Sequence, residues 1–83
     1  MNRVISNPTW GASLLEDTET GEFSFQCLCG GVGMYWQRVI LSHDEAEQIR
    51  IDPASADQMV SDVCKRSPHL VARLVDALDP TTI

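Results

Sequence analysis

The sequence predicts an α+β fold: a three-stranded antiparallel meander followed by two or three short helices packed on one face of the sheet, in the order βββααα. Three observations predict it. Before residue 42, three segments alternate apolar and polar residues, which is the period of a β-strand. Turn-forming residues separate these segments. After residue 42, apolar residues recur at the three- and four-residue spacing of amphipathic helices.

The length of the chain sets the domain organisation. With 83 residues there is room for a single domain, 1–83, with a thin core. A hydrophobic content of 43% and a charged content of 22% are typical of a folded chain. Residues 1–9 contain Asn, Ser and Pro, and we expect them to form a loose N-terminal arm.

The first strand begins at Trp10 and alternates apolar with polar side chains. Turn residues at 17–21 end it, and Gly21 can adopt the positive φ of a hairpin loop. The central strand covers 22–29. After the glycine-rich segment 30–33, the third strand covers 34–41, which is rich in aromatic and β-branched residues.

The strand register follows from placing the apolar side chains on one face. A four-residue first loop pairs Leu14 with Phe25, and it also pairs Ala12 with Cys27 and Trp10 with Cys29. A tight second loop at 31–32 predicts the remaining pairs: Cys29 with Met34, Cys27 with Trp36, Phe25 with Arg38 and Phe23 with Ile40. A one-residue slip in either hairpin would move its apolar residues to the other face.

Three helices are expected after the meander. Ser42 and Glu45 have the spacing of a capping box, so a first helix should run to about Arg50 with Ala46 and Ile49 facing inward. Asp-Pro at 52–53 and Ser-Pro at 67–68 start two further helices. Their apolar stripes are Ala56, Met59, Val60, Val63 and Cys64, then Leu70, Val71, Leu74, Val75 and Leu78.

Charge and hydropathy exclude several classes of partner. The formal net charge is −6 and the pI is near 4.5, which opposes binding to nucleic-acid phosphates and to anionic membranes. No stretch approaches membrane-spanning length. The first residues lack the apolar run of a signal peptide, so we expect a cytoplasmic protein whose three cysteines are reduced thiols.

No catalytic motif is recognisable. The segment 30–33 lacks the Lys-Ser/Thr ending of a P-loop and does not open a helix, so it is interpreted as a hairpin turn. His43 and His69 are expected on the surface. The prediction is therefore a protein that is not an enzyme and has no cofactor; a Cys–His enzyme would have to use Cys27, Cys29 and His69.

The cysteines leave two interpretations open. Unpaired cysteines on an inward face behave as small buried hydrophobic residues, and this predicts no metal site. The alternative is a zinc-binding structural or regulatory domain. Its ligands would be Cys27, Cys29, Cys64 and His69, although Cys-x-Cys on a strand is not the usual zinc spacing.

The face of the predicted sheet opposite to the helices carries a second apolar set. Either another part of the chain covers it or a partner protein does, with a symmetric homodimer as the simplest form. The prediction is a small non-enzymatic cytoplasmic protein-binding module, and the alternative is an acidic immunity-type or decoy protein that neutralises a basic partner. The predicted interface consists of Leu15, Leu28, Tyr35, Val39 and Leu41.

Overall fold

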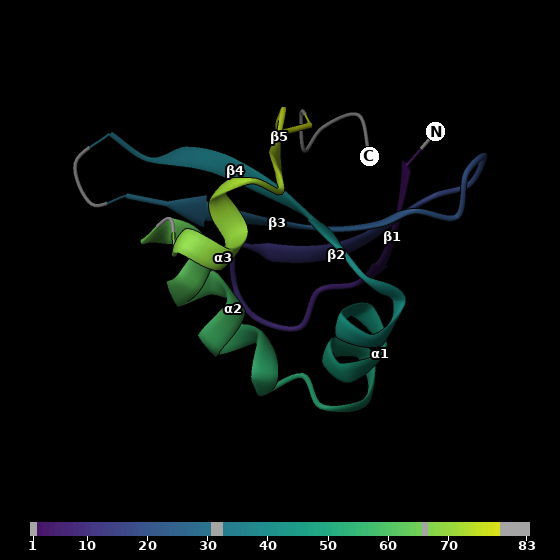
Figure 1. The fold of residues 1–83 in the computed structure, drawn as a ribbon. Helices are drawn as coiled ribbons and strands as arrows, with labels where there is room; N and C mark the ends of the chain where they lie inside the picture. The colour runs from purple at the N-terminus through teal and green to yellow at the C-terminus, as the bar shows by residue number, and fades with distance from the viewer. Residues whose placement is uncertain (1, 31–32, 66, 79–83) are drawn as a thin grey trace.

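The computed structural model of the protein describes residues 2–30, 33–65 and 67–78. Across these residues, five strands form one antiparallel sheet in the order β1-β2-β3-β4-β5, with α1 and α2 on one side of it (Figure 1). The α+β class is confirmed, but the predicted three-strand, three-helix order is not. The elements are β1 (Asn2–Ser6), β2 (Ala12–Asp17), β3 (Phe23–Cys29), β4 (Tyr35–Leu41), α1 (His43–Ile51), α2 (Ser55–Cys64), α3 (Pro68–Val71) and β5 (Leu74–Val75).

Strand β1 replaces most of the expected loose arm. The expectation is wrong for residues 2–6, which pair with β2 in a register that sets Val4 opposite Leu15. The Arg3 side chain also forms an ion pair with Glu16, with 2.8 Å between Nη2 and Oε1. The pairing shifts between Val4 and Ser6, and this irregularity interrupts the alternation by which a strand is recognised in a sequence.

The first predicted hairpin is confirmed in its register. Leu14 pairs with Phe25 and Ala12 with Cys27. Trp10 is an exception, because it precedes β2 and is 81% exposed, so its predicted pairing with Cys29 does not form. Gly11 separates Trp10 from the strand with a φ of 72°, a conformation that suits glycine.

The second predicted hairpin is wrong by one residue. Phe25 pairs with Val39 in place of Arg38, and Cys27 pairs with Gln37 in place of Trp36. The pair nearest to the loop is Cys29 and Tyr35, so five residues connect the strands, whereas the predicted loop had two. This odd number reverses the faces of β4.

The sheet therefore has a core face that includes Leu14, Phe25 and Val39, and a reverse face that includes Leu15 and Gln26. Buried apolar residues of the helices pack against the core face. They are Ala46 and Ile49 of α1, Ala56 and Val63 of α2, and Leu70 of α3.

The third predicted helix is largely wrong. Helix α3 ends at Val71, and residues 74–75 form β5 on the open edge of β4, with Leu74 opposite Val39. The backbone N–H of Ile40 also donates to the carbonyl of Arg73 at 3.1 Å. An unpaired strand edge offers hydrogen bonds that a helix cannot satisfy. Leu70 and Leu74 still reach the core, so a different backbone buries the predicted apolar residues.

The chain itself covers part of the reverse face. The Gln26 side chain donates to the Leu78 carbonyl and accepts from the Leu78 N–H, both at 2.8 Å. Arg38 Nε donates to the Asp76 carbonyl at 2.8 Å. Residues 76–78 thus lie against the reverse face, on the side of the sheet opposite to α1 and α2 (Figure 1).

The capping box of α1 is confirmed. Ser42 Oγ accepts from the Glu45 N–H at 3.2 Å, and Glu45 Oε1 accepts from the Ser42 N–H at 2.9 Å. We expect Ser42→Ala to lower the free energy of unfolding by about 1 kcal/mol, because a backbone N–H of the first turn loses its acceptor. Urea denaturation measures this. Ser61→Ala, within α2 and not at an N-cap, is the control, and an equal loss in both variants would contradict a capping effect.

Candidate functional site

The five predicted interface residues do not share an exposed face. Leu15, Val39 and Leu41 are buried, Leu28 is half-buried, and only Tyr35, with 43% of its surface exposed, is accessible. Val39 and Leu41 lie on the core face, because the β4 register differs by one residue from the predicted register. The five residues therefore do not form one exposed patch in this structure.

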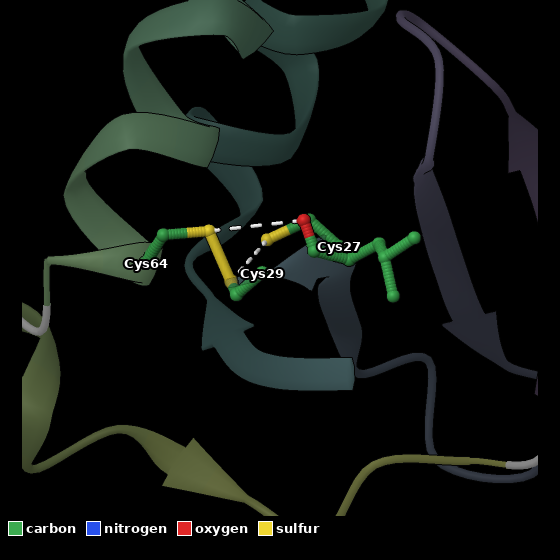
Figure 2. Close-up of a disulfide and its surroundings, with 4 residues drawn as sticks. Cys27, Cys29 and Cys64 are labelled. Atoms are coloured by element: carbon green, nitrogen blue, oxygen red, sulfur yellow. Dashed lines mark hydrogen bonds between the residues drawn. A yellow bond between two sulfur atoms is a disulfide. The ribbon is translucent and has the colours of Figure 1, made fainter. Parts of the chain in front are cut away.

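Two of the three cysteines form a disulfide, which corrects the expectation of three reduced thiols. Cys29 at the end of β3 and Cys64 at the end of α2 form a disulfide, with 5.3 Å between their Cα atoms (Figure 2). Their separation of 35 positions connects the sheet to a helix, and no short spacing in the sequence indicates it. The Cys64 sulfur also lies 3.9 Å from the Leu28 carbonyl oxygen.

Cys27 keeps a free thiol and is buried, as expected for a core cysteine. Its Sγ lies 3.8 Å from Cys29 Sγ, beside the disulfide (Figure 2). Burial raises the pKa of the Cys27 thiol to about 11, so the thiol stays protonated at neutral pH. A protonated, enclosed thiol is a poor nucleophile, which weighs against cysteine catalysis.

The two histidines lie away from the sulfur atoms. His69 is exposed, and its Nε2 is 4.0 Å from a carboxylate oxygen of Asp62. His43 packs edge-on against the ring of Phe23, with 5.4 Å between the ring centroids. Within the described residues, the metal-ligating side chains that converge are Cys27, Cys29 and Cys64, without His69.

A groove between α1 and α2 is the surface feature that the sequence did not reveal. It has a volume of about 400 Å³. Ile49 and Met59 supply its apolar lining, and Asp44, Glu45 and Asp62 line the same groove. Among the described side chains that line this groove, none is a lysine or an arginine.

The helix starts and turns position these groups. The capping box fixes Asp44 and Glu45 in the first turn of α1. The turn at 52–54 then leads into α2, where Ala54 N–H donates to Asp52 Oδ1 at 3.2 Å and Asp62 accepts from Gln58 Nε2 at 2.9 Å.

Glu45 is the most constrained acid of the groove. Burial raises the pKa of its carboxyl, but hydrogen bonds from the Ser42 backbone and from Arg73 outweigh that effect and hold the pKa below its ordinary value. The carboxylate therefore stays ionised at neutral pH, but its ion pair with Arg73 offsets the charge, so Asp44 and Asp62 supply most of the uncompensated negative charge of the groove. Asp44 and Glu45 could be noticed in the sequence as a first-turn pair, but their proximity to Asp62 depends on how the two helices pack.

Two other hollows are less specific. In one, between β1 and α1, the cations are already neutralised, because Arg3 pairs with Glu16 and Arg50 with Glu47. In the other, Trp10 and Trp36 lie among uncharged residues. Neither combines apolar lining with an excess of one charge, as the α1–α2 groove does.

No protein-family model matches the chain, and neither a curated protein nor a solved structure matches it. Among the described residues, no helix has the length and apolar character needed to cross a membrane. The functional proposal therefore rests on the geometry of the described residues.

Proposed function

We propose that the protein is a non-enzymatic binding module whose α1–α2 groove binds a basic segment of a partner protein. The observation that carries the proposal is the composition of the groove. The carboxylates of Asp44 and Asp62, and that of Glu45 in its ion pair with Arg73, line the same groove as the apolar side chains of Ile49 and Met59. A partner segment with lysine or arginine on both sides of an apolar anchor is complementary to this arrangement.

The charge of the whole chain supports a basic partner. The net charge of −6 attracts cations from a distance and repels a second copy of the same chain. A heterologous partner therefore fits the groove better than the homodimer expected from the sequence. The alternative, an acidic immunity-type or decoy protein, would also require a basic partner.

The apolar lining supports binding to a protein in particular. Ile49 is anchored in the core, whereas Met59 is half-buried at the groove. Methionine side chains adapt to differently shaped apolar partners and are common on surfaces that bind amphipathic helices. A simple cation would need the carboxylates but not the apolar lining.

The proposal includes the cytoplasmic location expected from the sequence. The Cys29–Cys64 disulfide is unusual for that location, since cytosolic reductants open most disulfides. The location and the disulfide are compatible when the protein works in both an oxidised and a reduced form.

The test uses a short synthetic helical peptide of leucine and lysine as the probe. We expect isothermal titration calorimetry to show that Asp44→Asn/Asp62→Asn weakens binding by about 5-fold, because two carboxylates at the docking surface are lost. Met59→Ala should weaken it by a similar factor through lost apolar contact. Amide chemical shifts should change mainly in α1 and α2.

The matched control is Asp57→Asn/Asp76→Asn, which removes the same charge from exposed positions that do not line the groove. It should leave affinity nearly unchanged. Equal losses in both double variants, or shifts spread over the sheet, would mean that the peptide responds to net charge alone and would overturn the groove as the site. Absence of binding to the wild-type protein would also overturn it.

A further inference from the structure

The sulfur atoms of Cys27, Cys29 and Cys64 form a compact triangle. All three lie within 4.8 Å of one another, and Cys27 Sγ is 3.8 Å from Cys29 Sγ. In a tetrahedral zinc site with Zn–S bonds of about 2.3 Å, neighbouring sulfur atoms lie about 3.8 Å apart. One edge of the triangle, Cys27–Cys29, therefore already has the length that zinc requires; the bonded pair must separate, and the Cys27–Cys64 edge, which is within 4.8 Å, adjusts as Cys64 moves.

We propose that reduction of the Cys29–Cys64 disulfide converts this cluster into a zinc site with three thiolate ligands. Cys27 and Cys29 project side by side from β3, and Cys64 approaches them from the end of α2 (Figure 2). Because Cys64 is only half-buried, a water molecule could reach a bound zinc ion from that side and supply its fourth ligand. The site does not include His69 and does not depend on the α1–α2 groove.

A dithiol reductant can supply the electrons and protons that open the disulfide. The reductant gives two electrons and two protons to the Cys29–Cys64 bond, which becomes two thiols, while the dithiol closes to its own disulfide. Zinc then displaces one proton from each of the three thiols as the sulfur–metal bonds form. The oxidised and the zinc-bound forms thus both connect β3 to α2.

A buried amide on the strand opposite Cys27 is a second observation that points to a metal-bound thiolate. Gln37 is the cross-strand partner of Cys27 and is only 8% exposed. Its Nε2 has no hydrogen-bond partner among the described residues. A buried donor without an acceptor is costly, whereas N–H donors commonly support the sulfur ligands of metal sites. Directly opposed residues lie close enough for such a contact.

The geometry disfavours a disulfide shuttle as the role of Cys27. A thiolate attacks a disulfide sulfur in line with the bond that breaks. With an S–S bond of about 2.05 Å, an in-line Cys27 would lie about 5.9 Å from Cys64, but the observed sulfur atoms are all within 4.8 Å. Convergence on one point suits a shared metal ion better than exchange along a line.

The experiment compares oxidised protein with protein reduced by a water-soluble phosphine, which is itself oxidised to the phosphine oxide. Native mass spectrometry after addition of zinc should show one zinc ion per reduced chain and none per oxidised chain. Cobalt in place of zinc should give an intense thiolate-to-cobalt charge-transfer band. Zinc should also protect all three thiols from alkylation.

Three variants make the test specific. Cys27→Ser keeps the disulfide and should fold when oxidised, but it should lose zinc binding when reduced. Gln37→Leu should weaken zinc binding by about 10-fold, the size expected for a lost support of a metal ligand, without lowering the stability of the oxidised protein. His69→Gln should bind zinc like the wild-type chain.

Zinc binding that persists in reduced Cys27→Ser, or a loss in His69→Gln equal to that in Cys27→Ser, would overturn the proposal. So would a reduced wild-type chain that binds no zinc, including one that unfolds on reduction and is not refolded by the metal. Refolding with one bound zinc supports it, because metal binding then drives folding. Peptide binding by the groove is measured separately, so each proposal can fail without the other.

Discussion

Replacing Cys29 and Cys64 together by alanine is expected to lower the free energy of unfolding by about 4 kcal/mol. The bridge closes a loop between positions separated by 35 residues, and opening such a loop restores conformational freedom to the unfolded chain. A chain of this size has a total stability of about 4 to 12 kcal/mol, so the loss is a large fraction of it. The midpoint of thermal unfolding should fall by about 20 °C.

Urea denaturation of the oxidised proteins measures this effect. Cys27→Ala is the matched control, because it also removes a buried sulfur but leaves the bridge intact. It should cost only about 1 kcal/mol. If the two variants were equally destabilised, packing of the sulfur atoms would be responsible and the bridge would contribute little.

The bridge also affects the groove. Cys64 lies at the end of α2, the helix that supplies Met59 and Asp62 to the proposed docking groove. Opening the bridge without metal removes a covalent attachment of α2 to β3. If both proposals hold, the oxidised and zinc-bound forms should keep the groove in shape, and the reduced metal-free form should bind the peptide more weakly.

Local sequence signals predicted the local structure well. The alternating pattern located β2, β3 and β4, and the capping box at Ser42 and Glu45 located the start of α1. Each of these signals depends on residues a few positions apart. The first hairpin register was also correct, because both of its strands carry a clear apolar face.

The errors arose where structure depends on distant parts of the chain. A longer loop shifted the register of β4 by one residue and reversed its faces; because β4 has apolar residues at both parities, its apolar pattern does not exclude this register. β5 forms because β4 leaves an open edge, which an apolar helical stripe at 70–78 does not reveal.

The candidate sites likewise depend on contacts between distant parts of the chain. The disulfide joins residues 35 positions apart, and the groove requires the observed packing of α1 against α2. The sequence favours buried core cysteines and offers a zinc set of the three cysteines with His69 only as the alternative; the structure brings together only the three sulfur atoms. Sequence could name these residues but could not establish which of them meet.

Val39→Asp is expected to leave most of the protein unfolded at room temperature. Val39 is fully buried on the core face, opposite Phe25 and Leu74. The substitution loses the burial of an apolar side chain, about 2 kcal/mol, and places an unpaired carboxylate in the core, which costs about 3 kcal/mol or more. The sum of about 5 kcal/mol is comparable with the whole stability of such a chain.

Ile40→Asp is the matched control, since Ile40 is next in sequence but points to the reverse face and is only half-buried. Its carboxylate can reach water and lies on the same face as Arg38, so the variant should remain folded with a loss of about 1 to 2 kcal/mol. Circular dichroism with urea denaturation distinguishes the two. In the register predicted from the sequence, Ile40 faces the core and the order of the two losses is reversed. The milder pair Val39→Ala and Ile40→Ala, with the larger loss expected at Val39, decides the register even if both aspartate variants unfold.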